Sequence, residues 1–271
     1  MKTYIKTTKL ILIALSFVIV SCKTSPEAAG ISEDEINAEA AKAYADVKSK
    51  SKVSTNQEWT AMVNRVAKRI ALASGKPYNW EVVLIDDPQV NAWCMPGGKM
   101  AVYTGIMPVL KTEAALAAVM GHEVSHATLK HGLAHYAQAK QSSMIGAVVG
   151  VGTILAGQVL CKTENCKKLA QLGGIAGGFA VAFFDMKFSR DDESAADKQG
   201  QIYMADAGYE PSESIKLWER MGAAGGGKPP EILSTHPSDE RRRGNLTAWL
   251  PAAEARYNAA PQKFGLGATI K

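Results

Sequence analysis

The sequence lacks the charge pattern of a nucleic-acid-binding protein. Its 31 Lys and Arg residues are nearly balanced by 26 Asp and Glu residues, which leaves a formal net charge of +5. Three lysines, Lys2, Lys6 and Lys9, lie in an N-terminal segment that we expect to be removed, so the mature charge falls to +2. The remaining charges form no clustered basic stripe and no aromatic recognition motif accompanies them. The sequence therefore predicts no nucleic-acid partner.

Long hydrophobic runs are also scarce, and the first is too short for an ordinary membrane span. Residues 10–20 are apolar and follow the N-terminal lysines, as in a signal peptide, whereas a spanning helix needs about 20 apolar residues. Residues 19–22 (Ile-Val-Ser-Cys) are typical of a bacterial lipoprotein cleavage box, which makes Cys22 the acylated first residue of the mature chain. A simple secretory signal is the alternative. Lys23 is not the aspartate that retains lipoproteins in the inner membrane, so the outer membrane is favoured.

The chain shows no internal repeat, and the length that remains after signal removal fits one large domain. We predict a signal peptide over residues 1–21, a tether with an N-terminal helix over residues 22–50, and a single folded domain over residues 51–271. Ser32 and Glu35 have the spacing of a capping box, which predicts where the N-terminal helix opens.

Cysteine is rare, with four residues in 271. Cys161 and Cys166 separate two uncharged runs rich in Gly and Ala, residues 142–161 and 169–184. We predict a packed helical hairpin closed by a Cys161–Cys166 disulfide, because the second run is short for a bilayer crossing and an oxidising compartment permits disulfides. Two membrane-spanning helices are the alternative. Cys94 is expected to be a buried thiol, with pairing to one of the other two left open.

Histidine is scarce too, yet two of the five histidines stand in the pattern H-E-x-x-H at residues 122–126. Positions four apart on a helix lie about 40° apart around its axis, so His122 and His126 can bind one metal ion. Glu123 projects nearby and can take a proton from water. Three protein ligands on zinc leave one position open for that water. A chance match on a solvated helix is the alternative for so short a motif.

The residues around the motif favour a helix. Thr112 can cap a helix over residues 113–139, which carries apolar residues at helical spacing. Gly121 costs about 1 kcal/mol of helix propensity relative to Ala, which suggests that another element approaches the backbone there. On one continuous helix His131 and His135 point to roughly the opposite face from His122, so we do not expect them to bind the metal.

A third ligand must come from elsewhere, and residues 189–197 offer the best candidate. Glu193 and Asp197 lie four apart, hence on one helix face, and the small Ala195 and Ala196 would permit close packing. We expect Glu193 to bind zinc, and Asp197 to accept the ring N–H of a ligand histidine. The alternative is a solvated helix whose N-terminal acids are favoured by the helix dipole.

Four separated blocks together resemble the HtpX and CAAX-prenyl-protease family of zinc metalloendopeptidases, of the gluzincin type. The blocks are residues 91–105 (NAWCMPGGKMAVYTG), 121–126 (GHEVSH), 189–197 (SRDDESAAD) and 234–241 (STHPSDER). Their order and approximate spacing are those of the family, and the resemblance is strongest to its periplasmic, LoiP-like lipoprotein members. It implies an α+β fold, namely a helix-rich gluzincin-type domain with a small sheet before the zinc-binding helix, and one Zn²⁺ ion per chain.

Two apolar, β-branched segments, residues 80–85 and 99–104, and a turn at residues 96–98 (Pro-Gly-Gly) predict that small sheet. The resemblance implies that an edge strand accepts substrate backbone as an added strand. The residues of that predicted edge strand are Gly98, Lys99, Met100, Ala101 and Val102.

His236 precedes Pro237, which suits the first position of a helix, so we place the imidazole at a helix entrance. The resemblance implies a catalytic role for His236 near the zinc, either hydrogen-bonding the oxyanion or occupying the open zinc position at rest. A surface or capping histidine is the alternative. Arg190, Arg241 and Arg242 are candidates to bind the carboxylates.

The sequence therefore predicts a zinc endopeptidase, lipid-anchored at the periplasmic side of a membrane. Zn²⁺ is held by His122, His126 and Glu193, and Glu123 is the general base. Polypeptides are the expected substrates, and the resemblance implies misfolded or damaged envelope proteins. The competing class is a non-enzymatic binding or chaperone-like protein that keeps the metal scaffold. Glu123 argues against it, because a structural zinc site needs no general base.

Overall fold

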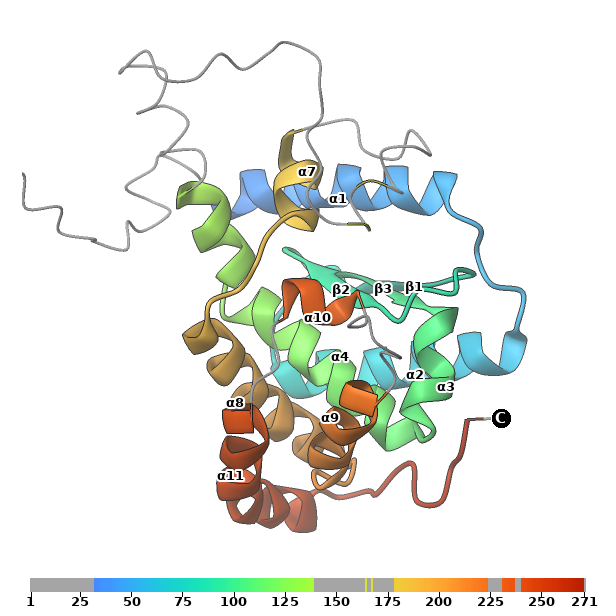
Figure 1. The fold of residues 1–271 in the computed structure, drawn as a ribbon, viewed down its shortest axis with the longest axis vertical. Helices are drawn as coiled ribbons and strands as arrows, with labels where there is room; N and C mark the ends of the chain where they lie inside the picture. Colours follow the sequence, from blue (N-terminus) through green and yellow to red (C-terminus); the bar gives the residue numbers. More distant parts are fainter. Residues whose placement is uncertain are drawn as a thin grey trace, which may run out of the picture.

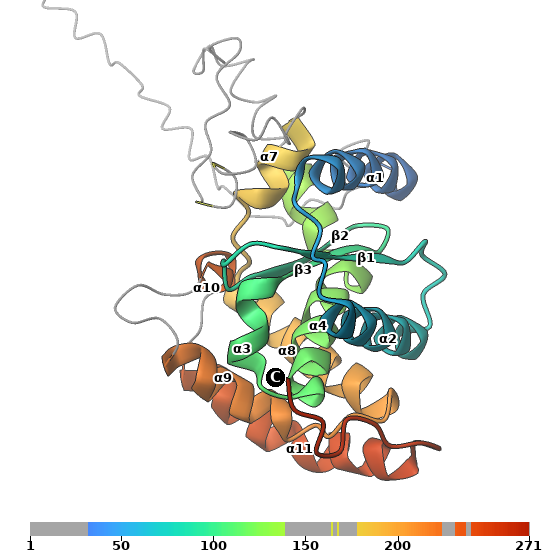
Figure 2. The same cartoon turned by 90° about the vertical axis from the view of Figure 1, so that its right-hand side faces the viewer.

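The computed structural model describes residues 32–138, 164, 167, 178–223, 231–236 and 240–270. In these residues a small sheet lies between two layers of helices (Figure 1). Figure 2, turned by 90°, places α1 (Glu33–Lys50) and α7 (Gly178–Phe184) on one face of the sheet. On the other face lie α2 (Gln57–Ser74) and α4 (Glu113–Thr128). This helix-rich arrangement with one small sheet confirms the predicted fold class.

The sheet has three strands in the order β1-β3-β2. The strands are β1 (Glu81–Ile85), β2 (Ala92–Met95) and β3 (Lys99–Tyr103), with β3 parallel to β1 and antiparallel to β2. The prediction that residues 98–102 form an edge strand is therefore wrong, because β3 is the central strand and is paired on both sides. The Pro-Gly-Gly turn predicts that β2 and β3 pair, but it carries no signal that β1 occupies the far side of β3.

Side chains alternate between the two faces of the sheet, and each face packs against a different helical layer. The core between the sheet, α1 and α7 includes Val83, Ile85, Trp93, Met95, Ala101 and Tyr103. The core between the sheet, α2 and α4 includes Leu84, Ala92, Cys94, Met100 and Val102. All of β2 and β3 is buried, so the sheet is a rigid platform beside α4.

Local capping signals place the helix starts where they are expected. The Ser32 side chain accepts the backbone N–H of Glu35, and the Glu35 carboxylate accepts the backbone N–H of Ser32, which confirms the capping box. The Thr112 side chain accepts the N–H of Ala115 and caps α4 as predicted. The helix α2 ends at Gly75 in the left-handed conformation (φ 63°), the usual glycine role at a helix end.

The helix that carries the zinc motif is shorter than predicted. It ends at Thr128 instead of Ala139, because Lys130 adopts a left-handed backbone conformation (φ 61°) that breaks the helix. A separate helical segment follows over residues 131–138. The directions in which the side chains of that segment point consequently do not follow the periodicity of α4.

The helix α8 (Arg190–Asp206) crosses α4 closely through two glycines. A Cβ atom on Gly121 would lie 2.7 Å from the carbonyl oxygen of Gly200, so the backbones touch where the sequence suggested a close approach. On α8 that role belongs to Gly200 together with buried Ala196, whereas Ala195 is exposed and takes no part. The remaining elements are η2 (Thr104–Ile106), α3 (Met107–Leu110), α9 (Glu213–Ala223), α10 (Ile232–Thr235) and α11 (Glu240–Ala259).

Several predictions fall outside the described residues, namely the signal peptide, Cys22 and the Cys161–Cys166 disulfide. Among the residues that are described, no helix is both long and apolar enough to cross a membrane. Cys94 is a free thiol and is buried, as predicted. Its pKa is raised well above the ordinary value because burial disfavours the thiolate.

Candidate metal centre

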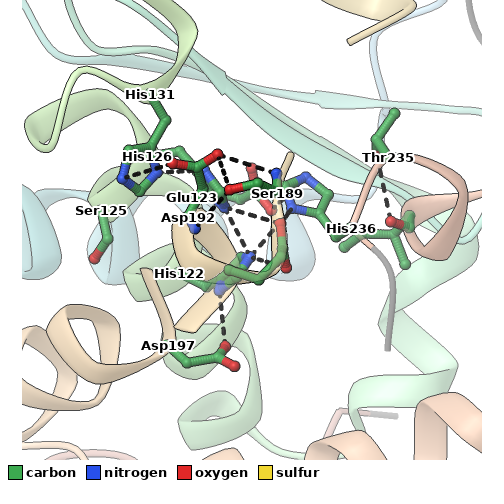
Figure 3. Close-up of polar contacts among 12 residues, drawn as sticks. His122, Glu123, Ser125, His126, His131, Ser189, Asp192, Asp197, Thr235 and His236 are labelled. Atoms are coloured by element: carbon green, nitrogen blue, oxygen red, sulfur yellow. Dashed lines mark hydrogen bonds and ion pairs between the residues drawn. The ribbon is translucent and has the colours of Figure 1, made fainter. Parts of the chain in front are cut away.

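The two histidines of the motif lie one turn apart on α4 and face the same point (Figure 3). The Nε2 atoms of His122 and His126 are 3.1 Å apart, and both side chains are buried. Burial, followed by the neighbouring cationic and imidazole groups, lowers the pKa of His126 well below the ordinary value. A neutral imidazole with a bare nitrogen is the form that binds a metal.

Glu193 comes from the first turn of α8 and completes a triangle of donor atoms. Its Oε2 lies 3.5 Å from His122 Nε2, and its Oε1 lies 3.5 Å from His126 Nε2. Tetrahedral zinc with ligands at 2.0–2.1 Å requires donor atoms about 3.3–3.4 Å apart. Two imidazole nitrogens and one carboxylate at 3.1–3.5 Å therefore fit zinc both in spacing and in donor type.

Asp197, one turn after Glu193, orients the first histidine. Its Oδ1 lies 2.9 Å from His122 Nδ1, which leaves Nε2 of His122 free to face the metal position. Arg242 of α11 donates two hydrogen bonds of 2.6 Å to Asp197, and its Nη1 lies 2.7 Å from Glu193 Oε2. Burial alone would raise the pKa of Asp197, but the charge and hydrogen bonds of Arg242 and the contact with His122 outweigh it and lower the pKa.

The second histidine has an orienting partner that the sequence did not reveal. His131 Nδ1 lies 3.0 Å from His126 Nδ1 (Figure 3), and His135 Nε2 lies 3.0 Å from Asp192 Oδ2. The prediction that His131 and His135 point to the opposite face is wrong, because the break at Lys130 redirects the chain. His131 stays outside the cluster of possible ligand atoms, so the expectation that it does not bind the metal stands.

Glu123, the predicted base, is buried beside this cluster with one oxygen unused. Within the described part of the chain, Glu123 Oε1 has no hydrogen-bond partner. Burial raises the pKa of Glu123 above its ordinary value, although the neighbouring His236 and His122 oppose the shift. A buried carboxylate oxygen that accepts no hydrogen bond is costly to the fold, so such a group points to function.

His236 joins the cluster from a different part of the chain. Its Nδ1 lies 3.2 Å from His122 Nε2 and 3.0 Å from Glu193 Oε1, and its Nε2 lies 3.6 Å from Glu123 Oε1. Burial alone would lower the pKa of His236, but the carboxylates of Glu123 and Glu193 raise it. The residue directly follows the one-turn helix α10, and the predicted helix entrance at Pro237 lies outside the described residues.

A candidate metal cluster of four buried side chains results. Ligand atoms of His122, His126, Glu193 and His236 all lie within 4.8 Å of one another. The adjoining cavities are small, with about 30 Å³ beside β2 and Glu123 and about 20 Å³ beside α8 and Glu123. Since a water needs about 10–15 Å³, this space admits water but no peptide side chain.

Three further side chains shape the site, and sequence reasoning identified only one of them. Arg242 was a candidate and binds both carboxylates, whereas Arg190 and Arg241 are exposed. Trp218 of α9 lies under the Arg242 guanidinium, with 3.8 Å between Cζ and the ring centroid. Phe188 packs on His126, with ring centroids 3.9 Å apart. An aromatic residue without a motif gives no local signal of such a position.

Comparisons with known proteins agree with this geometry. The profile of Peptidase family M48 matches residues 53–250. Mitochondrial metalloendopeptidase OMA1 of Schizosaccharomyces pombe is 36% identical over 200 residues, which cover 73% of this chain and 55% of that protein. Metalloprotease YcaL of Escherichia coli is 28% identical over 226 residues, which cover 81% of this chain and 82% of that protein.

A third relative, the beta-barrel assembly-enhancing protease of Escherichia coli, is 27% identical over 186 residues, which cover 68% of this chain and 37% of that protein. The chain spans about half the length of the first relatives it matches. The family match confirms the metallopeptidase family that the four sequence blocks resemble.

Proposed function

Because the chain belongs to peptidase family M48, we propose that it is a zinc-dependent endopeptidase that hydrolyses polypeptides. One observation carries the proposal. The donor atoms of His122, His126 and Glu193 have tetrahedral zinc spacing, and Glu123, whose buried Oε1 accepts no hydrogen bond from the described residues, lies beside them. A purely structural zinc site would need no general base beside its ligands, and Glu123 stands in that place.

The bound zinc would polarise the scissile carbonyl and lower the pKa of water. Glu123 accepts a proton from the attacking water and passes it to the departing amine nitrogen. Its raised pKa suits this task, because a base is most effective when its pKa is near the working pH. Asp197 and Arg242 hold His122 and Glu193 in place, since each side chain contacts the next through a short polar contact.

His236 lies where a fourth ligand would be at rest. The Nδ1 atom of His236 lies 3.2 Å from His122 Nε2, and the Nε2 atoms of His122 and His126 lie 3.1 Å apart. The two spacings are therefore nearly equal. The adjoining space of about 30 Å³ cannot hold a peptide. Substrate entry therefore requires movement of His236, after which its imidazole is available to hydrogen-bond the oxyanion.

The substrate backbone is best placed along β2 instead of the central strand β3. Residues 91–94 line the cavity that also contains Glu123, His126 and His236. Among the described strands, β2 is paired with β3 alone, so its other side can accept an extended chain as an added strand. Binding through backbone hydrogen bonds depends little on the substrate's side chains, which suits unfolded proteins of varied sequence.

We place the protein in the bacterial envelope, with Cys22 as the site of lipid attachment. The lysines, the short apolar run and the cysteine box of residues 1–22 support this placement. The Escherichia coli relative named for β-barrel assembly supports envelope proteins as substrates and a quality-control role. Replacing Cys22 and adding a cleavable secretory signal should release the protein from the outer membrane into the soluble periplasm. Carbonate-resistant membrane association of that variant would contradict lipid anchoring.

Metal analysis and cleavage of an unfolded protein test the activity together. The purified chain should hold one zinc and cleave casein, and a chelator should abolish cleavage until zinc is returned. Glu193→Ala should lose zinc to a competing chelator that leaves the unaltered protein loaded. Asp191→Ala is the matched control, since Asp191 is an exposed acid on the same helical turn. Unaltered zinc retention by Glu193→Ala would show that the ligand set is wrong.

A further inference from the structure

The free side of β1 carries unpaired backbone groups. On the side of β1 that faces β3, the N–H of Glu81 donates to the carbonyl of Gly98 (3.0 Å). The backbone N–H and C=O groups of Glu81 therefore point toward β3, and those of the next residue point away from it. On the outer side, Ser54 N–H donates to the carbonyl of Leu84 (2.9 Å) and covers only the C-terminal half. The N–H and C=O of Val82 therefore point outward, and no described residue bonds them.

A groove of about 760 Å³ runs beside this uncovered half of β1. Its volume lies within the range of about 300–1,000 Å³ that is usual for ligand sites, whereas the cavities at the metal centre are far smaller. The apolar lining comes from α2, the sheet and the residue before β1, namely Ala67, Ala71, Leu72, Trp80, Val82 and Met100. Leu72 is 72% exposed, which makes it the most exposed large apolar side chain of the described residues.

The rim of the groove is positively charged. Lys48, Lys68 and Lys76 line it and are exposed. Glu81 is the one acid in the lining, and its carboxylate accepts a hydrogen bond from Lys99 Nζ (2.7 Å). The groove consequently favours an anionic occupant.

We propose that the β1 groove binds an extended, acidic segment of a second protein as an added strand. Only a polypeptide backbone offers a donor and an acceptor at the spacing of the Val82 N–H and C=O. Apolar side chains of the segment would cover Leu72 and the α2 floor, and its carboxylates would face the three lysines. The position of β1, with β3 between it and β2, keeps this surface apart from the metal centre. The proposal does not depend on the peptidase activity.

Peptide binding to the full chain tests the proposal. The probe is a fluorescein-labelled peptide of alternating valine and aspartate, six residues long, followed by fluorescence polarisation. Lys68→Glu should weaken binding about tenfold, and Lys68→Glu with Lys76→Glu should weaken it further. Lys198→Glu is the matched control, because it reverses an exposed lysine on α8, away from the groove. Circular dichroism confirms that each variant is folded.

The backbone contacts need their own readout. Saturating peptide should slow hydrogen exchange of the Val82 amide at least fivefold, and a peptide N-methylated at alternate residues should bind at least tenfold more weakly. Equal binding by Lys68→Glu and Lys198→Glu, or equal binding of the N-methylated peptide, would overturn the proposal. So would binding to vesicles of anionic lipid, sensitive to Lys68→Glu, with no binding of the peptide, because that result assigns the surface to a membrane.

Discussion

The two halves of α4 each bury a glutamate, and the two glutamates differ in their hydrogen bonds and in the direction in which their pKa is shifted. At the N-terminal end, Glu113 accepts hydrogen bonds from Arg65, Arg69 and Tyr209, at 2.6–3.3 Å. Ten residues later, Glu123 is equally buried, at 4% exposure, yet its Oε1 accepts no hydrogen bond from the described residues and has only His236 Nε2 at 3.6 Å. Burial raises the pKa of Glu123, whereas at Glu113 the same burial is outweighed by Arg65 and Tyr209 and the pKa is lowered.

The difference shows how a buried carboxylate can be assigned to stability or to chemistry. A paired carboxylate at a helix N-terminus stabilises the folded state, because its hydrogen bonds and the helix dipole favour the ionised form. A buried carboxylate whose oxygen accepts no hydrogen bond lowers the stability of the folded state and is kept where a reaction needs a base. Substitution of the two residues should therefore change different measurable properties.

The largest expected effect is on turnover. Glu123→Gln should lower the cleavage rate by about 10²–10⁴-fold, because it removes the general base and leaves the zinc ligands in place. Zinc content should stay at one per chain, and the melting temperature should not fall. The rates are compared at matched zinc occupancy, with Glu113→Gln as the control. Turnover of Glu123→Gln within twofold of the unaltered protein would refute the assigned base.

A smaller effect, on zinc affinity, is expected for the residues that contact the ligand histidines. Asp197→Ala and His131→Ala should each weaken zinc affinity by about 10–100-fold, as losses of ligand-orienting partners do. The loss should be greater for Asp197, whose carboxylate is charged and is also bound by Arg242. His135→Ala serves as the control, because His135 bonds Asp192 and not a ligand. Competition with a chelator of known affinity measures all three, and equal losses for His131→Ala and His135→Ala would remove His131 from this role.

The smallest effect is on stability. Glu113→Gln should lower the free energy of unfolding by about 1–3 kcal/mol, because buried donors lose a charged acceptor. The cleavage rate per folded molecule should not change. Urea denaturation of metal-loaded protein provides the measurement. A stability loss in Glu123→Gln that equals the loss in Glu113→Gln would erase the distinction between the two halves of α4.

The pH dependence of that loss follows from the lowered pKa of Glu113. A carboxylate with a lowered folded-state pKa contributes stability that is present above its unfolded pKa, about 4.3, and disappears as pH falls through the folded value. The difference between unaltered protein and Glu113→Gln should thus be full at pH 6 and shrink below about pH 4. A difference that grows on acidification would contradict the sign of the shift.

Much of the site could be predicted from the sequence, because the motifs that predict it span only a few residues each. The H-E-x-x-H spacing places two imidazoles on one helical face whatever the rest of the chain does. Thr112 and Ser32 cap their helices through residues three positions away. Glu193 and Asp197 share a face for the same reason of periodicity. Each of these statements needs only the geometry of a single turn of helix.

Other features depend on contacts between distant segments, which periodicity does not encode. The strand β3 became central because β1 packs on its far side, although a hairpin alone would have left it at an edge. His131 faces His126 because one left-handed residue, Lys130, ends α4 early. Which residue of α8 meets Gly121 depends on the rotation of the two helices against each other, and in the structure it is Gly200.

The sequence by itself determined the family, the metal-binding pair, the base and the helix caps, since these rest on spacings of three or four residues. Only the tertiary structure decided that Glu193, His236 and Arg242 converge on His122, from positions 71 to 120 residues further along the chain. The physical reason is that local backbone geometry fixes the direction of side chains within one helix. Convergence of separate helices is fixed by the packing of their apolar faces, which here brings α8 against α4 and α11 against α8 and leaves Glu123 Oε1 buried without a hydrogen bond among the described residues.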